Sequence, residues 1–278
     1  GAAEPLAQLM PAVYMIEQIH VVANVSRYGL PEVQTALEAL MKAGRVALEW
    51  QEKLGPVNKK LDEMGYPSPT GGFCYAPFDF LGDTLRGTKG IIMDMYRQPD
   101  KLLEALERST PIMIKWGTSS RLGSCPMITI PLHKGADGFM SDEQFEKFYW
   151  PTLLRVIEGL AEEGLMTRLF AEGGYNTRLE AIRDDLPKGK TIWHFDFTDM
   201  ARAKEIIGDA ACLMGNVPAS LLQAGTVEET TAYCKQLIQT AGKDGGYILA
   251  TGVGISRTAK VENVRAMIDA AKKYGVYS

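Results

Sequence analysis

The chain has 278 residues, of which 46% are hydrophobic and 23% charged, as in globular proteins that bury a full core. Its net charge of −4 gives no electrostatic case for nucleic-acid binding. No apolar run reaches the roughly 18 residues of a membrane span, and Gly1–Leu9 lacks the basic-then-apolar order of a signal peptide. The four cysteines are isolated, which argues against a disulfide framework, and we expect a cytoplasmic protein.

The first 70 residues read as a helical segment packed on the remainder. Apolar residues from Leu6 to Ile19 recur at helical spacing, and His20 beside them is best explained as a packing residue. Pro31 then opens a second helix that continues through Leu54. The Pro- and Gly-rich stretch 65–72 is a loop. We therefore divide the chain into an N-terminal helical segment, 1–70, and barrel units over 71–278.

From residue 72 onward, short apolar runs alternate with amphipathic stretches. Ser141 and Thr226 stand before acidic first turns and are predicted helix N-caps. The expected helices are Pro99–Glu107, Asp142–Gly164, Thr177–Asp185, Met200–Ile207, Thr226–Ala241 and Val261–Tyr274. The expected strands are Gly72–Phe78, Met127–Leu132, Thr167–Ala171, Thr191–Phe197, Ala211–Val217 and Tyr247–Thr251.

Repeated strand-then-helix order predicts an α/β protein whose strands are parallel and buried on both faces. Six strands satisfy either a doubly wound sheet or a (βα)8 TIM-type barrel that lacks part of its N-terminal segment in this chain. In both architectures the functional site lies beyond the C-terminal ends of the strands. The residues to inspect there are Asp79, His133, Glu172, His194, Asp196 and Asn216.

His194 and Asp196 are two residues apart in one strand and therefore point to the same side. They could share a metal ion, or the carboxylate could orient the imidazole. The alternative is a buried histidine that bonds a neighbouring carboxylate for structural reasons only.

Glu172 follows a buried strand and precedes two glycines, which suits a metal ligand or a general acid or base. The equally simple alternative is a loop carboxylate that pairs with Arg178 or caps the next helix. His133, Lys134 and Asp137 form an ionisable cluster after another strand. The cluster could hold a substrate carboxylate, supply a further metal ligand or merely keep the loop soluble.

Several motifs from residue 72 onward resemble one known family. The run Gly245–Gly252 and the later Val261–Met267 resemble the C-terminal signature of the uroporphyrinogen decarboxylase superfamily. Ala76-Pro-Phe-Asp79 and Lys134–Ser141 are similar to its corrinoid-dependent methyltransferase branch, in particular the methyltransferase component of anaerobic O-demethylases. The resemblance covers residues 72 to the C-terminus and implies a TIM-type barrel.

The resemblance also implies a metal site. Thiol methyltransferases of this superfamily bind zinc through an H-x-C motif, which falls here on Phe170, Ala171 and Glu172. Glu172 thus stands where a ligand is expected, and His194 lies on the next strand. These harder ligands suit a zinc ion that polarises an ether oxygen.

The function that the resemblance implies is methyl transfer from a methoxylated substrate to the cobalt of a separate corrinoid protein. We expect Glu172 and His194 as metal ligands, Asp196 and His133 as catalytic groups, and Asp79 and Asn216 at the substrate. Two alternatives stay open: a decarboxylase that works without metal, and a non-catalytic barrel that binds a corrinoid partner. A homodimer is the oligomeric state to test first.

Overall fold

The computed structural model describes residues 28–66, 71–121 and 125–276. The chain divides into two compact units, residues 1–67 and 68–278. The expected helix from Leu6 to Ile19 and His20 lie outside the described residues. Among those described, every helix is too short or too polar to span a lipid bilayer.

The described part of the first unit is dominated by one long helix, α3 (Pro31–Glu63). It begins at a proline, which lacks the N–H that the first turn leaves unpaired. It has no buried residue in its whole length, and Leu40, Trp50 and other apolar side chains are exposed. The prediction that a helix starts at Pro31 is therefore confirmed, and the helix runs nine residues beyond Leu54.

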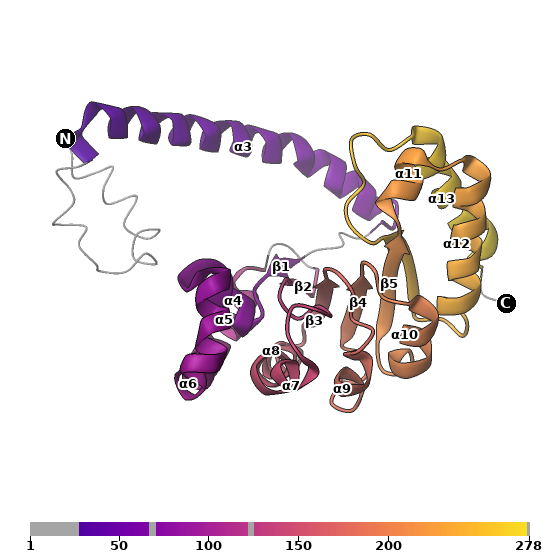
Figure 1. Cartoon of the computed structure of the whole chain (residues 1–278). Coiled ribbons are helices and arrows are strands. Elements are labelled where there is room, and N and C mark those ends of the chain that lie inside the picture. Colours follow the sequence, from indigo (N-terminus) through magenta and orange to yellow (C-terminus); the bar gives the residue numbers. More distant parts are fainter. Residues whose placement is uncertain (1–27, 67–70, 122–124, 277–278) are drawn as a thin grey trace. The chain divides into compact units, whose positions relative to one another are not determined.

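The second unit is built on a six-stranded parallel sheet in which each strand pairs with the next one along the chain (Figure 1). This order, with helices between strands, is that of a TIM-type barrel, and the described strands do not close into a ring. The strands are β1 (Gly72–Phe73), β2 (Met127–Leu132), β3 (Met166–Ala171), β4 (Thr191–Phe195), β5 (Cys212–Val217) and β6 (Tyr247–Thr251).

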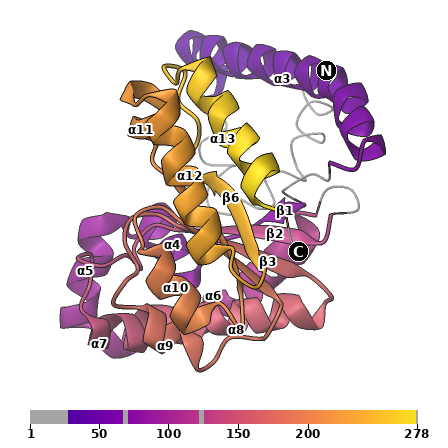
Figure 2. The same cartoon turned by 90° about the vertical axis from the view of Figure 1, so that its right-hand side faces the viewer.

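Helices follow the strands along the chain, and two of them are interrupted by single π-helical turns, Leu81–Leu85 and Phe145–Tyr149. The helices of the second unit are α4 (Pro77–Phe80), α5 (Gly87–Arg97), α6 (Pro99–Ser119), α7 (Asp142–Gln144), α8 (Trp150–Glu162), α9 (Leu179–Arg183), α10 (Met200–Ile207), α11 (Ala219–Ala224), α12 (Val227–Ala241) and α13 (Val261–Tyr274). Figure 2 shows α12 and α13 beside β6.

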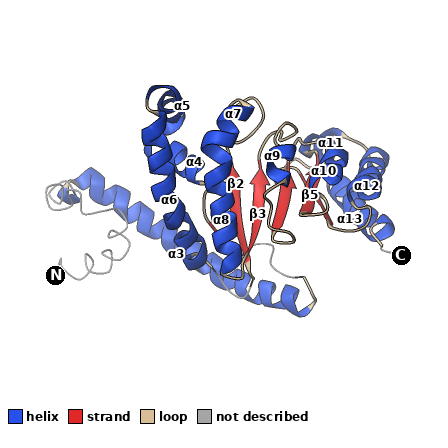
Figure 3. Cartoon of the chain, turned by 90° about the horizontal axis from the view of Figure 1, so that it is seen from below, coloured by secondary structure: helices blue, strands red, loops and turns tan. Residues whose placement is uncertain are grey.

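The core lies between the sheet and the helices on its outer face. Ile130, Leu169 and Trp193 point to this face and are fully buried. The Trp193 ring packs at 6.3 Å, centre to centre, from that of Trp150 at the start of α8. Seen from below, α6, α8 and α9 lie in front of the strands (Figure 3). The opposite, inner face carries the alternate residues, many of them only partly buried.

The predicted strand Gly72–Phe78 is wrong beyond Phe73, because the chain turns into α4 at Pro77. A proline at the first helical position has a fixed φ and needs no backbone donor, so the local sequence favours the helix. The consequence matters for the site, since the first turn of α4 buries Asp79 completely.

Candidate functional site

The buried carboxylate of Asp79 is the centre of a polar network at the C-terminal ends of β1 and β2. Its oxygens accept hydrogen bonds from the backbone N–H groups of His133 and Lys134, each at 3.0 Å. The hydroxyl of Tyr149 donates a third, at 2.6 Å. Three donors hold a side chain that has no contact with solvent, so its orientation is fixed.

The environment of Asp79 shifts its acidity. Burial raises the pKa of Asp79 to about 6, although the hydrogen bonds from Tyr149 and His133 oppose the shift. Burial also raises the pKa of the Tyr149 and Tyr175 hydroxyls well above their ordinary value, so both stay protonated donors. Tyr175 donates to the carbonyl of Leu132 at 3.2 Å. A buried carboxyl group that titrates near neutrality suits proton transfer.

Asp83 lies next to this network and binds the side chains of Lys134 and His133. Its carboxylate pairs with the buried ammonium of Lys134 and, at 2.6 Å, with Nδ1 of His133. Burial acts to raise the pKa of Asp83, but the hydrogen bonds from Lys134 and His133 outweigh it, and the pKa is lowered. Asp79, Asp83 and His133 form the group of described residues whose ligand atoms all lie within 4.8 Å of one another, as a metal ion requires.

His194 lies on the inner face of β4, in register with Phe170 of β3. The two rings pack at 4.8 Å between centres. Nε2 is 2.7 Å from the carbonyl oxygen of Thr251, which can only accept, so Nε2 carries the hydrogen. Nδ1 is buried and has no hydrogen-bond partner. Burial lowers the pKa of His194, and the imidazole is therefore neutral with a free lone pair on Nδ1.

Glu172 follows the last residue of β3 and is partly exposed. Neither Glu172 nor His194 belongs to the group of three possible ligands found among the described residues. Their assignment as metal ligands thus stays a prediction, as do the roles assigned to the other sequence-selected residues.

Asp196 and Asn216 line the same cleft, of about 550 Å³, beyond the ends of β4 and β5. Asp196 accepts a hydrogen bond from the N–H of Gly173 at 3.3 Å, which ties its loop to the one that carries Glu172. Asn216 donates to the Thr198 carbonyl at 2.7 Å. A Cβ on Gly252 would lie 2.7 Å from Oδ1 of Asp196, so this glycine permits the close approach.

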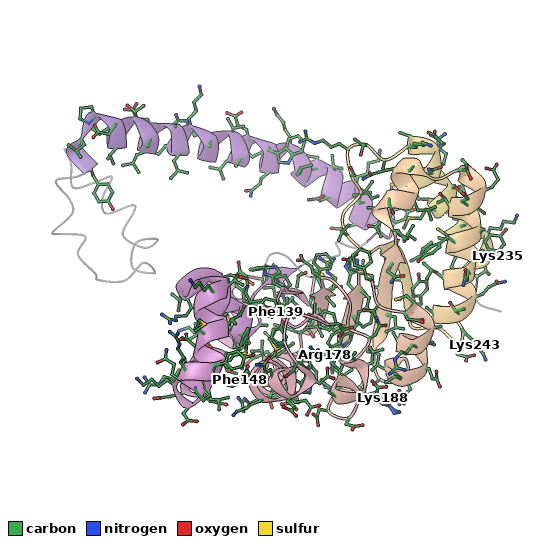
Figure 4. The ribbon with its side chains drawn as sticks, viewed as in Figure 1. Phe139, Phe148, Arg178, Lys188, Lys235 and Lys243 are labelled. Atoms are coloured by element: carbon green, nitrogen blue, oxygen red, sulfur yellow. The ribbon has the colours of Figure 1, made fainter. Side chains whose placement is uncertain are left out.

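Sequence reasoning named Arg178 only as a possible partner of Glu172 and missed its role: it is buried and holds the loop after β2. Its guanidinium donates to the carbonyls of Gly135, at 3.2 Å, and Met140, at 2.6 Å, and pairs with Asp142. Figure 4 places Arg178 within the body of the unit, whereas Lys188, Lys235 and Lys243 lie at its periphery. Because Arg178 is used in this way, it is not the partner of Glu172 that the sequence offered as an alternative.

The chain is similar to a known protein family and to several characterised members of it. The family model described as Uroporphyrinogen decarboxylase (URO-D) matches residues 15–274. A uroporphyrinogen decarboxylase from Anaeromyxobacter dehalogenans is 30% identical over 140 residues, which are 50% of this chain and 38% of that protein. The Methylcobamide:CoM methyltransferase MtaA from Methanosarcina barkeri is 26% identical over 215 residues, 77% of this chain and 60% of its own length.

A solved structure shares the fold. A methyltransferase from Methanosarcina mazei superimposes with a TM-score of 0.63 at 24% identity, over 78% of this chain and 62% of that one. The chain thus spans less than two thirds of the length of these relatives.

Proposed function

The chain belongs to the uroporphyrinogen decarboxylase family, and on that premise we propose that it is a corrinoid-dependent methyltransferase. The reaction moves a methyl group from a methoxylated substrate to the cobalt of a separate corrinoid protein. The similarity to MtaA, whose name states methyl transfer from a methylcobamide to CoM, supports methyl transfer that involves a corrinoid, although in the opposite direction. The motifs shared with O-demethylase components support a methyl ether as the donor.

The observation that carries the proposal is the free lone pair of His194. Its Nε2–H is fixed by the Thr251 carbonyl, which selects the tautomer in which Nδ1 is unprotonated. Histidine ligands in metal sites are held in this way, with the second ring nitrogen donating to a carbonyl or carboxylate. A buried imidazole nitrogen without a partner is costly unless a ligand or metal completes it.

His194 and Glu172 would hold a zinc ion, and Asp196 would position them through the loop that begins at Gly173. Zinc bound there supplies a Lewis acid that stabilises the oxygen from which the methyl group leaves. An imidazole nitrogen and a carboxylate oxygen are both common zinc ligands.

The group formed by Asp79, Asp83 and His133 is a poorer zinc site because its lone pairs are already used. Three donors bond the carboxylate of Asp79, and the ammonium of Lys134 competes for Asp83. We assign these residues to the substrate instead. Asp79, with its pKa of about 6, would hold or release a proton, and His133 would move one at Nε2 while Asp83 fixes Nδ1. Asn216 would line the substrate cleft.

The test is zinc content and methyl transfer in matched histidine variants. We expect His194→Gln and Glu172→Gln to lose bound zinc and to reduce methyl transfer at least a hundredfold, since removal of a ligand removes the Lewis acid. His133→Gln should keep its zinc. Loss of zinc in His133→Gln, with full zinc in His194→Gln, would instead assign the metal to the group around Asp79.

A metal-independent decarboxylase is the second candidate, favoured by the pKa of Asp79. A buried acid that titrates near neutrality could protonate a carbanion after CO₂ leaves. Release of CO₂ from a carboxylic acid substrate by zinc-free protein, abolished in Asp79→Asn, would establish it. Binding of a corrinoid protein without turnover of either substrate class would point to the non-catalytic alternative.

A further inference from the structure

The cleft beyond the ends of β4 and β5 has a volume of about 550 Å³ and a negatively charged lining. It is bounded by the loop that follows β4, the start of α10 and one side of α12. The lining contains two carboxylates, Asp196 and Asp199, and among the described residues no lysine, arginine or histidine. Neither carboxylate forms an ion pair with a described residue. The described lining therefore carries two negative charges that it does not balance.

Several polar side chains of the lining already use their donors within the protein. Nδ2 of Asn216 and the hydroxyl of Thr240 both donate to backbone carbonyls, at 2.7 Å and 2.9 Å. The carboxylate of Asp196 accepts one hydrogen bond, from a backbone N–H at 3.3 Å, and a carboxylate can accept several more. Charge and unused acceptors thus both favour a positively charged ligand.

The N-terminus of α10 borders the same cleft but does not make it a site for anions. Oδ1 of Asp199 accepts hydrogen bonds from the backbone N–H groups of Ala201, at 2.9 Å, and Arg202, at 3.1 Å. The partial positive charge of this helix end is therefore already compensated by a carboxylate of the chain. An anion that entered the cleft would be repelled by Asp196 and Asp199 together, whereas a cation would be attracted by both.

Two aromatic rings line the cleft beside these carboxylates. Phe197 directly follows Asp196 in the chain and is 74% exposed, so a molecule in the cleft can reach its ring. Tyr233 contributes a second, partly buried ring from α12. The face of an aromatic ring attracts a cation, and it also packs against the carbon atoms that an organic ammonium ion carries. The aromatic rings thus favour an organic cation over a bare metal ion.

We propose that this cleft binds an organic ammonium ion, with its positive charge beside Asp196 and Asp199 and its carbon atoms against Phe197. The volume of the cleft is that of an ordinary small-molecule site. Resting on the proposed function, this site makes the methyl donor a methoxylated amine. Primary and methylated amines share this chemistry, and the experiment below separates them.

The experiment titrates the full chain with choline and ethanolamine by calorimetry, without a corrinoid partner. Their uncharged analogues, dimethylbutanol and propanol, have carbon in place of nitrogen. At least one ammonium should bind about tenfold or more tightly than its analogue, because two carboxylates and a ring act on its charge. Tighter binding of choline indicates a methylated amine, and tighter binding of ethanolamine indicates a primary amine.

Charge-neutral variants test the two carboxylates. Asp196→Asn and Asp199→Asn should each weaken binding of the preferred ammonium about threefold or more. Asparagine keeps the acceptor for the loop at Asp196 and remains a good N-cap for α10 at Asp199, so both variants should fold. The matched control is Glu205→Gln, which removes an exposed charge of α10 outside the lining and should leave binding unchanged.

Phe197→Leu tests the ring and should weaken binding of the preferred ammonium about threefold, whereas Tyr96→Leu, at another exposed aromatic residue, should not. Each ammonium binding no better than its uncharged analogue would overturn the site, as would wild-type affinity in both Asp196→Asn and Asp199→Asn. Charge-dependent ammonium binding in a protein that transfers no methyl group would sustain the site and reject the proposed function. Methyl transfer from an uncharged methoxylated substrate, without ammonium binding, would reject the site alone.

Discussion

At the scale of single residues, the acidity of the site is decided by a balance between burial and hydrogen bonding. Asp79 has three donors and yet a raised pKa, because complete removal from water outweighs them. Asp83 is partly exposed and bonds the ammonium of Lys134 and the imidazole of His133, and its pKa is lowered. The pKa values of two carboxylates in one cluster are thus shifted in opposite directions. Such a difference allows one neighbouring group to act as an acid and the other as a base.

These shifts predict opposite pH dependences of stability. The folded protein binds a proton at Asp79 more tightly than the unfolded chain does, so its contribution is complete below pH 3.8 and is lost as the pH rises through about 6. The difference in unfolding free energy between the wild type and Asp79→Asn should fall by roughly 3 kcal/mol across this window. Chemical denaturation at several pH values measures it.

Asp83→Asn provides the contrast for that measurement. A lowered pKa stabilises the folded state above the unfolded pKa, and the contribution disappears as the pH falls through the folded value. The difference in unfolding free energy between wild type and Asp83→Asn should therefore shrink as the pH falls. The same difference for Asp79→Asn should grow as the pH falls. Parallel curves for both variants would contradict the assignment of these shifts.

At the scale of elements, local sequence fixes where the helices around the site begin. The Thr226 hydroxyl accepts from the N–H of Glu229 at 3.1 Å, and the Glu229 carboxylate accepts from the N–H of Thr226 at 2.8 Å. Ser141 and Gln144 form the same reciprocal pair. Both N-caps predicted from the sequence are confirmed. Each satisfies two backbone donors that the first turn would otherwise leave unpaired.

The cap of α12 can be tested by substitution. Thr226→Ala removes an acceptor for the first turn and should lower the unfolding free energy by about 1 kcal/mol. Thr231→Ala, inside the same helix, loses only a bond from its hydroxyl to the Val227 carbonyl and should change stability by less than about 0.5 kcal/mol. Equal effects in the two variants would show that the cap contributes nothing specific.

At the scale of the whole molecule, one buried arginine links loops that belong to different strands. Arg178, just before α9, bonds the carbonyls of Gly135 and Met140 in the loop after β2. Its guanidinium also lies 4.8 Å from the centre of the Phe145 ring. The loop that it holds carries His133 and Lys134 at its start, so Arg178 helps to keep the polar network around Asp79 in place.

Replacement of Arg178 should lower the stability of the folded protein substantially. Arg178→Leu leaves two carbonyls without donors and should lower the unfolding free energy by about 3 kcal/mol or more. Arg183→Leu, at the end of α9, removes an exposed ion pair with Asp209 and should lower the unfolding free energy by less than about 1 kcal/mol. Thermal and denaturant unfolding of the two variants compares them directly. A small loss for Arg178→Leu would mean that the loop is held by other contacts.

Much of the fold could be predicted from the sequence because hydrophobic period and capping chemistry act locally. The strands Met127–Leu132 and Tyr247–Thr251 and the helices Met200–Ile207 and Val261–Tyr274 have the predicted ends. The strand after Gly72 was predicted too long, because an apolar run does not distinguish a strand from a buried helix. The helix from Pro99 continues through Pro111 to Ser119, since packing outweighs that proline.

The candidate site, like the fold, was predictable from the sequence only in part. The sequence by itself placed His133, Asp196 and Asn216 at or just past strand ends, because a parallel sheet brings those ends to one edge. It also placed Asp79 there, but β1 ends at Phe73 and Asp79 lies in the first turn of α4. Only the tertiary structure decided which side chains meet. Asp83 and Tyr149 contact Asp79 from positions that follow no strand. Burial and hydrogen-bond partners depend on residues far apart in the chain, and no local pattern encodes them.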